Sequence, residues 1–200
     1  MANKIFEEFG KNPLILFGKW LSEAEKSEPN DPNAMALATV DNNGRPAVRM
    51  VLLKSFDERG FIFFTNYESA KGQALLKNPY AELNFHWKSL QKQIRISGSI
   101  EKTSAAEADE YFASRSRMSQ LGAAASAQSR NLESYENFEG AVKALDQKYK
   151  DQDIPRPSHW GGFRVIPEKI EFWIGHPQRL HKRFVYARRG EAWDANWLYP

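Results

Sequence analysis

The sequence predicts one domain of the α+β class that is mainly β, an antiparallel barrel with peripheral helices. Short segments in which apolar and polar residues alternate are separated by turn-forming residues, which is typical of half-buried strands. Five such segments follow one another through mainly short connections, and short connections favour antiparallel pairing. A helix-rich stretch then interrupts the strands at residues 104–150. With 200 residues the chain can bury roughly 70% of the surface of its unfolded form in a single domain.

The first expected element is a helix within an N-terminal helical segment, residues 1–30. Asn12 is a candidate N-cap, and Pro13 suits the first helical position because its missing N–H would have no partner there. Apolar residues then recur at helical spacing, at Leu14, Phe17, Leu21 and Ala24. The segment Glu28–Pro32 contains two prolines and ends this helix after about Ser27.

Strands are expected next, each ended by a turn signal. The turn Asp41–Arg45 joins the first strand to the second, and Glu58–Gly60 joins the second to the third. A short helix over Glu68–Lys77 separates the third strand from the fourth. The strands expected in this half are Met35–Val40, Ala47–Phe56, Phe61–Thr65, Ala81–Trp87 and Gln93–Thr103.

Residues 104–150 are predicted to form a helical insertion. The segment Ser104–Glu107 fits a capping box and begins a helix that runs to about Arg115. An Ala/Ser-rich helix is expected from about Met118 to Gln128. Ser134 begins a third helix, which has one apolar face formed by Phe138, Val142, Leu145 and Tyr149.

The C-terminal stretch joins core-like strands to a cluster of cationic side chains. Pro155 and Pro157 end the helical region, and four strand-like segments then extend to Leu198. The first part of this stretch, Trp160–Gly175, is expected to form two short strands before a turn at Gly175–Gln178.

Cationic residues at alternate positions begin the strand expected after that turn. They are Arg179, His181 and Arg183. Residues two apart in a strand point to one face and lie about 7 Å from each other. The pattern indicates a row of cationic side chains that binds an anionic ligand. The alternative is an edge strand whose charged side chains are solvated.

Arg49 and Lys54 stand at the two ends of an apolar run. Burying either charge without an anion would cost several kcal/mol, so an anionic ligand is expected. The alternative is that both residues are strand ends that reach solvent. An offset of five places the two side chains on opposite faces of a regular strand. Either a bulge intervenes, or each side chain faces a different wall of a shared site.

A third candidate set, Tyr111, Arg115 and Ser119, is spaced by four residues. If one helix continued through all three, a hydroxyl, a guanidinium and a second hydroxyl would lie along one face. Such a set suits a phosphate group. By spacing alone, a solvated helix face is the more common arrangement.

The composition argues against several classes of protein. The chain has no cysteine, so no disulfide, thiolate metal site or cysteine nucleophile is available, and no metal site is predicted. The net charge of +3 is mild and spread over a chain that is 26% charged, unlike the concentrated basic patch of a nucleic-acid binder. The N-terminus lacks an export signal, and no apolar stretch approaches the roughly 18 residues of a membrane span. We expect a cytoplasmic protein that binds neither nucleic acid nor membrane.

Motifs in three regions of the chain match one known family. They are R-x-V-L-L-K from Arg49, Y-F-x-S-R-x-R-x-S-Q-x-G from Tyr111, and WGGFRV, IEFW and RLHxRF in order from Trp160. Through them the chain resembles the pyridoxamine 5'-phosphate oxidases, flavoenzymes that use FMN, over about residues 13–200. The resemblance implies the FMN-binding split barrel, an antiparallel Greek-key barrel, as a single domain over residues 1–200.

The resemblance also implies which residues bind FMN. Arg49 would hold the phosphate, and Lys71 lies near the start of a helix, where the dipole favours phosphate as well. Gln128 and Ser129 match a pair that contacts FMN from the partner subunit, which implies a homodimer with sites at the interface. Trp173 would be interpreted as a core aromatic without its motif. The residues expected at the cofactor are Arg49, Met50, Val51, Leu52, Leu53, Lys54, Phe64, Thr65, Lys71, Gln93, Gln128, Ser129, Trp173 and Arg183.

The substrate residues come from two of the motifs and from Lys54. Arg179 and His181 are expected to be catalytic, because they would hold the substrate ring so that its C4' hydrogen faces flavin N5. The substrate phosphate would be bound by Lys54, Tyr111, Arg115 and Ser119. The full set implied by the resemblance is Lys54, Tyr111, Arg115, Ser119, Arg179, Leu180 and His181.

The sequence departs from the family pattern at two places. The family commonly has an Arg-Lys pair where this chain has Ala70 before Lys71, so one phosphate contact is missing. Family members often carry an Arg-x-x-Tyr segment that covers the active site, and nothing matching it precedes Phe9. Asp31 matches an acidic residue near the substrate, although beside Pro32 it also fits a simple turn former.

The expected activity is the FMN-dependent oxidation of pyridoxamine 5'-phosphate, and of pyridoxine 5'-phosphate, to pyridoxal 5'-phosphate. Oxygen would reoxidise the flavin and yield hydrogen peroxide. Two alternatives remain open at this point. One is a different FMN-dependent oxidoreductase on the same barrel, and the other is a non-catalytic protein that binds FMN or pyridoxal phosphate.

Overall fold

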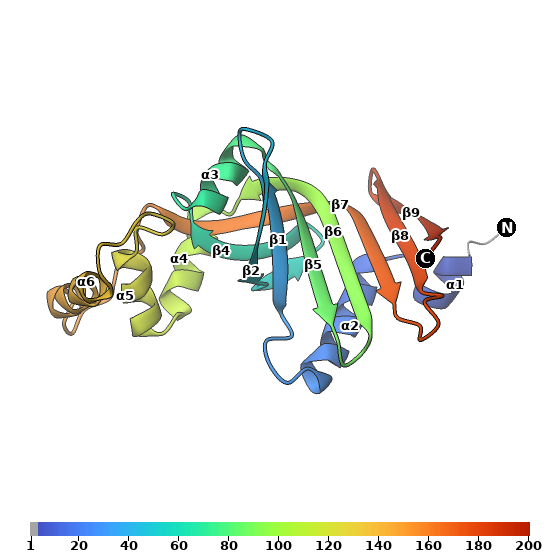
Figure 1. Ribbon diagram of the computed structural model, residues 1–200, viewed down its shortest axis with the longest axis horizontal. Helices are drawn as coiled ribbons and strands as arrows, with labels where there is room; N and C mark the ends of the chain where they lie inside the picture. Colours follow the sequence, from blue (N-terminus) through green and yellow to red (C-terminus); the bar gives the residue numbers. More distant parts are fainter. Residues whose placement is uncertain (1–3) are drawn as a thin grey trace.

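The computed structural model describes residues 4–200, so the first three residues of the expected N-terminal segment lie outside it. Figure 1 shows a strongly bent sheet with helices at its two ends. The helices are α1 (Lys4–Phe9), α2 (Pro13–Ser27), α3 (Ala70–Lys77), α4 (Ala105–Ser114), α5 (Arg117–Ala125) and α6 (Tyr135–Lys148). The strands are β1 (Ala34–Val40), β2 (Pro46–Leu52), β3 (Ser55–Asp57), β4 (Gly60–Asn66), β5 (Tyr80–Trp87), β6 (Lys92–Lys102), β7 (Trp160–Ile174), β8 (Lys182–Arg189) and β9 (Ala192–Leu198).

All the strand pairs are antiparallel, as predicted, and their order is β2-β1-β5-β6-β7-β4-β3, with β8 and β9 continuing from β7. The predicted strand Ala47–Phe56 is divided in two. Its first part, β2, pairs with β1 at one edge, and its second part, β3, pairs with β4 at the other. The break lies at Leu53 and Lys54, where the Lys54 N–H donates to the Ile62 carbonyl at 2.9 Å. This path connects the two edges, so the sheet closes into a barrel.

Helix α2 covers one end of the barrel and supplies the centre of its core. The Asn12 side chain accepts a hydrogen bond from the Leu14 N–H at 2.9 Å, which confirms the predicted cap. Phe17 is fully buried, and its ring meets those of Phe56, Phe61 and Phe85 edge-on at 4.8, 4.9 and 5.2 Å. Aromatic rings favour such edge-to-face contacts. Phe17 therefore packs into the barrel interior and holds α2 against the end of the barrel.

Strand β7 is a single strand of 15 residues, so the prediction of two short strands over Trp160–Gly175 is wrong. Pro167 cannot donate to a ladder, but the β6–β7 register shifts between Ser97 and Gly98, opposite that proline. A Cβ on Gly98 would lie 1.9 Å from the Ile166 carbonyl oxygen, so only glycine allows this close approach. The stretch from Trp160 to Leu198 consequently forms three strands instead of four.

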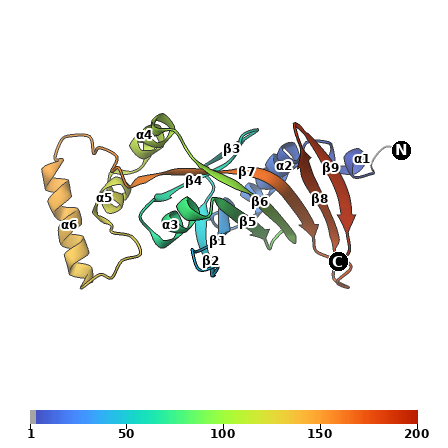
Figure 2. The same ribbon diagram turned by 90° about the horizontal axis from the view of Figure 1, so that it is seen from above.

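Helices α4, α5 and α6 lie together at one end of the molecule, opposite β8 and β9 (Figure 2). The predicted capping box at Ser104 and Glu107 is present, and α4 ends at Ser114 and α5 begins at Arg117, close to the predicted positions, whereas α5 ends at Ala125, before the expected Gln128. A small apolar cluster holds these helices to the start of β7; its buried members are Phe112, Leu121, Ile154 and Trp160. The insertion thus places its helices beside the first residues of β7.

No helix among residues 4–200 is long and apolar enough to cross a membrane. The same residues contain no group of three or more His, Asp or Glu side chains that could hold a metal ion.

Candidate functional site

A hollow of about 760 Å³ lies between β2, β4, α4 and α5. It brings together most of the cationic and hydroxyl residues that the motifs identify in the first two thirds of the chain. The expected site residues that line it are Met50, Val51, Leu52, Lys54, Phe64, Thr65, Lys71, Tyr111, Arg115, Ser119 and Gln128.

Arg115 provides the strongest sign of a ligand in this hollow. Its Nη1 atom is buried and has no hydrogen-bond partner. The guanidinium lies over the Trp160 ring at 4.9 Å from the ring centroid, an arrangement that favours a cation but satisfies none of its N–H groups. Burial lowers the pKa of Arg115 below its ordinary value. A buried cationic donor without a partner is costly, so this position is suited to an anion.

Tyr111, Ser119 and Lys54 surround the same hollow as Arg115, but not as one helix face. Arg115 is the C-cap residue of α4, so the condition that one helix continues from Tyr111 to Ser119 is not met, and the two helices expected here are separate. The Ser116 hydroxyl caps α5 and donates to the Ser119 hydroxyl at 2.8 Å. The Lys54 ammonium lies 5.7 Å from the centroid of the Tyr111 ring. The turn between the two helices therefore brings the set into one hollow.

Lys71 forms a second cationic position, in the first turn of α3. Its ammonium donates to Gln128 Oε1 at 2.6 Å, Thr65 Oγ1 at 3.2 Å and Ser69 Oγ at 3.3 Å. Burial lowers the pKa of Lys71, and the charge of Arg49 lowers it further. All three partners are neutral, so this charge also lacks an anion.

Arg49 lies near Lys71 but does not line the hollow. Its Nη1 atom donates to the Leu37 carbonyl at 3.2 Å, to Thr39 Oγ1 at 2.7 Å and to the Ala47 carbonyl at 3.0 Å. A regular strand would place Arg49 and Lys54 on opposite faces, but β2 ends at Leu52 and the chain between the two residues is not a regular strand. The offset of five residues therefore does not prevent the two side chains from facing a shared site. Leu53, expected at the cofactor, is instead buried in the barrel core.

Gln128 contacts Lys71 and Thr65 of its own chain, the latter at 3.5 Å. The prediction that it reaches this position from a partner subunit is therefore corrected. Ser129 follows with a left-handed backbone, φ 72°, and its side chain does not line the hollow.

The residues of the C-terminal motifs form a separate group. Gln93, Trp173 and Arg183 are directly opposite one another on β6, β7 and β8. The Arg183 guanidinium is paired with Glu171, with Nε at 2.9 Å and Nη2 at 2.8 Å from Oε1. The expected flavin contacts thus share one row across three strands, and one of them already has a carboxylate partner.

The prediction that Arg179, His181 and Arg183 alternate along one strand face is wrong, because β8 begins only at Lys182. Arg179 lies in the preceding loop with a left-handed backbone, φ 63°, and donates its N–H to the His176 carbonyl at 2.9 Å. The His181 ring lies 4.7 Å from the Trp173 ring, and its Nδ1 accepts the His176 N–H at 3.1 Å. A loop, and not a strand, places this imidazole beside the row of Gln93, Trp173 and Arg183. Leu180 is exposed in the same loop.

Within one chain the two groups do not meet. Trp160 lines the large hollow, whereas Trp173 and His181 line a small one of about 260 Å³, and the two hollows share no residue. Trp173 follows Trp160 by 13 positions on β7, roughly 40 Å along an extended strand. Within one chain the residues that the motifs identify therefore lie in two separate groups.

Trp160 and Asn66 are among the residues of the large hollow that were not identified as site residues from the sequence. The Trp160 ring stacks with Phe64 at 5.4 Å and lies under Arg115. Asn66 donates to the Ser126 carbonyl at 3.1 Å and ties the loop after α5 to β4. The position of Trp160 beside the paired glycines was a usable signal, but nothing in the sequence distinguished Asn66.

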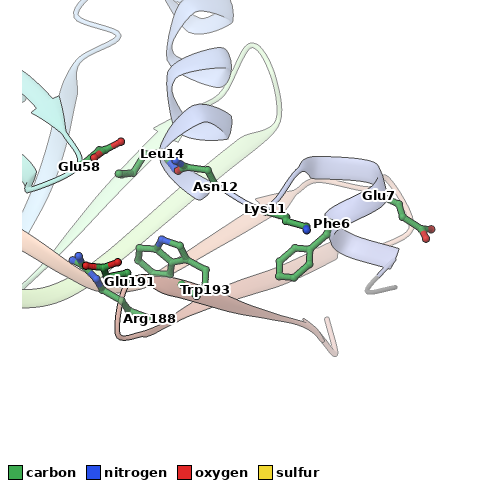
Figure 3. Close-up of a pocket in the computed structure, with 10 residues that line it drawn as sticks. Phe6, Glu7, Lys11, Asn12, Leu14, Glu58, Arg188, Glu191 and Trp193 are labelled. Carbon is green, nitrogen blue, oxygen red and sulfur yellow. The ribbon is translucent and has the colours of Figure 1, made fainter. Parts of the chain in front are cut away.

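Another hollow, of about 1060 Å³, lies between α1, the start of α2 and the β8–β9 hairpin (Figure 3). Lys11 and Arg188 line it together with three carboxylates, from Glu7, Glu58 and Glu191. These charges are mixed, and none of these side chains has a buried polar atom without a partner. The smaller hollow with Arg115 and Lys71 is therefore the better candidate for an anion site.

Comparisons with known proteins agree with this geometry. The family described as Pyridoxamine 5'-phosphate oxidase matches residues 21–149, and the Pyridoxine 5'-phosphate oxidase C-terminal dimerisation region matches residues 160–200. The pyridoxine/pyridoxamine 5'-phosphate oxidase of Gluconobacter oxydans is 62% identical over 189 residues, 94% of each chain. The protein of the same name from Gloeothece citriformis is 54% identical over 194 residues, 96% of this chain and 91% of its own.

Two solved structures are similar as well. PhzG from Burkholderia lata, in complex with tetrahydrophenazine-1-carboxylic acid, has a TM-score of 0.92 at 31% identity and covers 100% of this chain and 98% of its own. A pyridoxamine 5'-phosphate oxidase-related, FMN-binding protein from Nostoc punctiforme has a TM-score of 0.73 at 18% identity, with 91% and 96% covered. At that identity the second match supports the fold alone. The antiparallel barrel is the split barrel of these proteins, and the chain belongs to the pyridoxine/pyridoxamine 5'-phosphate oxidase family.

Proposed function

We propose that this chain oxidises pyridoxamine 5'-phosphate and pyridoxine 5'-phosphate to pyridoxal 5'-phosphate, with FMN as cofactor and oxygen as acceptor. The observation that carries the proposal is the buried, unpartnered Nη1 of Arg115 in a hollow shared with Lys54, Tyr111 and Ser119. Two cations and two hydroxyls are the donors that a phosphate dianion requires. In this proposal Arg115 is the main determinant that separates phosphorylated from unphosphorylated substrates.

The chain's residues also fit FMN. Lys71 and Arg49 are neighbouring cations with lowered pKa values, and in both cases burial is the main cause. A phosphate placed between them would compensate the burial of both charges, and Lys71, in the first turn of α3, adds the favourable end of a helix dipole. Bound FMN would supply the hydride acceptor that oxygen then regenerates.

The remaining roles belong to the loop before β8. Arg179 and His181 would orient the substrate ring, with His181 held by its contact with Trp173 and by the His176 N–H. Because Nδ1 accepts that hydrogen bond, the neutral imidazole would carry its proton on Nε2, which leaves an N–H donor for the substrate.

We further propose a homodimer in which each site takes Arg115 and Lys71 from one chain and the Trp173–His181 region from the other. The two hollows share no residue, and residues 160–200 match a dimerisation region, which together support this arrangement. Strand β2 presents an apolar face suited to burial, since Val48, Met50 and Leu52 are 66%, 64% and 38% exposed. This division differs from the one expected from the sequence, in which Gln128 and Ser129 came from the partner.

The test is turnover by the FMN-loaded protein. Pyridoxamine 5'-phosphate should yield pyridoxal 5'-phosphate, ammonia and hydrogen peroxide in equal amounts, and water and oxygen should be consumed. Arg115→Met should raise KM for the phosphorylated substrate by roughly 10- to 150-fold, the equivalent of one charge-assisted hydrogen bond. It should leave the slow oxidation of unphosphorylated pyridoxamine unchanged. A bound flavin without turnover would instead indicate a non-catalytic binding protein.

A second candidate is an oxidase that acts on a different heterocycle. The similarity to PhzG over the whole chain favours it, as does Ala70, where the family commonly has an arginine. Such an enzyme would reduce its flavin with tetrahydrophenazine-1-carboxylic acid faster than with pyridoxamine 5'-phosphate. Measuring both flavin reduction rates without oxygen distinguishes the two candidates.

A further inference from the structure

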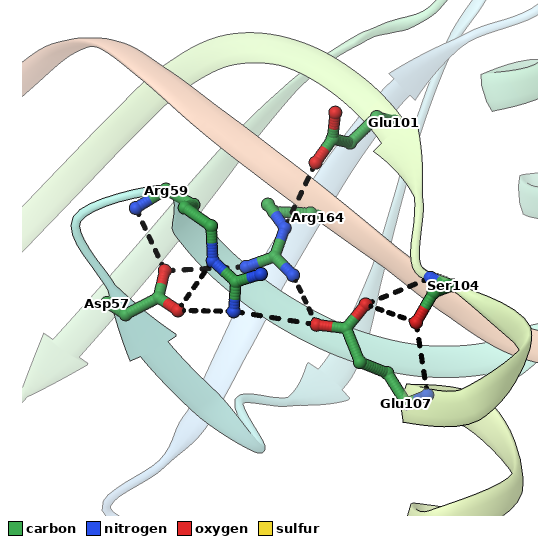
Figure 4. Close-up of polar contacts among 6 residues, drawn as sticks. All are labelled: Asp57, Arg59, Glu101, Ser104, Glu107 and Arg164. Atoms are coloured by element: carbon green, nitrogen blue, oxygen red, sulfur yellow. Dashed lines mark hydrogen bonds and ion pairs between the residues drawn. The ribbon is translucent and has the colours of Figure 1, made fainter.

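Arg164 is a buried arginine outside the candidate site. Its side chain is 2% exposed, and it projects from β7 into a group of carboxylates (Figure 4). Its Nη2 lies 2.6 Å from Glu107 Oε1, its Nε 3.1 Å from Glu101 Oε1, and its Nη1 3.4 Å from Asp57 Oδ1. These carboxylates come from α4, β6 and β3, so one guanidinium connects three separate segments to β7.

Glu107 is the member of this group that links Arg164 to the site. Its Oε2 accepts hydrogen bonds from the Ser104 N–H at 2.9 Å and the Ser104 hydroxyl at 3.0 Å, which completes the capping box. Its Oε1 faces Arg164, and Arg59 Nη2 lies 3.6 Å from the same oxygen (Figure 4). The Ser104 backbone hydrogen bond is the main cause of the lowered pKa of Glu107, and the charge of Arg164 adds to it. One carboxylate thus both begins α4 and docks it on β7.

Helix α4 contacts β7 at a second place, at the C-terminal end of the helix. Arg115 follows Glu107 by eight residues, about 12 Å along a helix, and Trp160 precedes Arg164 by four, about 13 Å along a strand. These two lengths agree. Arg164 therefore meets Glu107 at one end of α4, and Trp160 meets Arg115 at the other.

Gly162 lies between these two points on β7. A Cβ at this position would lie 2.7 Å from Thr103 side-chain atoms and 2.9 Å from the Phe64 ring. The residues just before α4 and on β4 therefore lie close against β7.

We propose that Arg164, through Glu107, is a positioning residue for substrate phosphate: it sets the placement of α4 on β7 and thereby of Tyr111 and Arg115. The proposal rests on the proposed function, because it assigns the phosphate to that pair. A displacement of about 1 Å in a binding group can cost as much as 100-fold in rate or affinity, so a salt bridge outside the site can control binding.

The chain offers a matched control for this idea. Asp57 and Glu107 both contact Arg164, and both have lowered pKa values. Asp57, however, belongs to the β3–β4 hairpin and reaches α4 indirectly, through Arg164 and through Arg59, whose Nη2 lies 2.7 Å from Asp57 Oδ2 and 3.6 Å from Glu107 Oε1. Removing either carboxylate takes one negative charge from Arg164, but only the Glu107 change removes a charge that α4 itself carries.

The experiment compares Glu107→Gln, Asp57→Asn and Arg115→Met in the FMN-loaded protein. Glutamine can still accept the Ser104 N–H, so the cap is retained while the charge opposite Arg164 is lost. We expect Glu107→Gln to raise KM for pyridoxamine 5'-phosphate by roughly 10-fold or more, with kcat and the Kd for FMN within about twofold of the wild type. Calorimetric titration with pyridoxal 5'-phosphate should show the same loss of affinity. Asp57→Asn should change neither quantity.

Three outcomes separate the claims. If Arg115→Met raises KM and Glu107→Gln does not, the positioning proposal is wrong and the proposed function stands. If Arg115→Met leaves KM unchanged, the phosphate assignment itself fails, and the positioning proposal fails with it. If Asp57→Asn weakens binding as much as Glu107→Gln, general destabilisation explains both effects, and the proposal is overturned.

Discussion

Replacing Lys71 with methionine should weaken FMN binding without destabilising the ligand-free protein. The ammonium has three neutral oxygen partners, at 2.6, 3.2 and 3.3 Å, and no carboxylate. A phosphate would add the missing counter-ion. One charge-assisted hydrogen bond contributes roughly 1.5–3 kcal/mol, so the Kd for FMN should rise roughly 10- to 150-fold. Methionine retains most of the apolar stem and removes only the charge.

Lys71→Met should weaken FMN binding but should not lower the stability of the ligand-free protein. Burial and the nearby charge of Arg49 lower the pKa of Lys71, so the folded ligand-free protein binds its proton less tightly than the unfolded chain does. A lysine whose folded pKa is lowered reduces stability at neutral pH, and this penalty disappears as the pH rises through the folded pKa. Lys71→Met should therefore leave the free energy of unfolding at pH 7 unchanged or higher.

The assay is fluorescence titration of the apoprotein with FMN, together with urea unfolding of the same apoprotein. Lys77→Met is the matched control, since Lys77 lies exposed in the last turn of the same helix, α3. It should leave the Kd for FMN unaltered. A change in Kd below about threefold for Lys71→Met, well under 1 kcal/mol, would refute the assignment of Lys71 to the phosphate.

Other predictions address acid stability, the bulge and the catalytic loop. The pKa of Glu107 lies below its ordinary 4.5. Glu107 therefore stabilises the fold above pH 4.5, and this contribution is lost as the pH falls through the pKa of the folded state. The free energy of unfolding should consequently fall less steeply with acid in Glu107→Gln than in the wild type. Gly98→Ala should destabilise the fold by roughly 1–3 kcal/mol in urea, because its Cβ would overlap the Ile166 carbonyl; a variant as stable as the wild type would contradict the close approach. Arg179→Ala and His181→Ala should retain FMN but lower kcat/KM for pyridoxamine 5'-phosphate by roughly 10- to 1000-fold, whereas loss of FMN with normal turnover after its re-addition would make either residue a cofactor ligand.

Local patterns in the sequence were sufficient for most of the elements. The Asn12 cap and the Ser104–Glu107 capping box depend on residues close together in the chain, so both could be predicted. The continuity of β7 could not, because it depends on the pairing with β6, whose register passes over Glu168 of β7 where Gly98 lies against Ile166 and Pro167. The loop at Arg179 likewise depends on a left-handed backbone that alternation of residue types does not reveal.

The candidate site shows the same division. Motif resemblance identified Tyr111, Arg115 and Ser119 as one set, but the reason they share a hollow is the helix break capped by Ser116, not a continuous helix. The role of Trp160 under Arg115 depends on how α4 is docked on β7, and no local pattern specifies that contact. The proposed division of the site between two chains rests on which residues a single chain keeps apart.

The central claim, a phosphate-binding oxidase site shared between two chains, is tested most directly by mixing two variants that are each impaired at pyridoxamine 5'-phosphate concentrations near the wild-type KM. Arg115→Met and His181→Ala homodimers are unfolded together, refolded and assayed with pyridoxamine 5'-phosphate and FMN. Random pairing makes half of the dimers mixed, and each mixed dimer carries one intact site of two, so activity should return to roughly a quarter of the wild-type value. A mixture no more active than either variant alone, while wild-type protein treated identically recovers, would contradict the shared site.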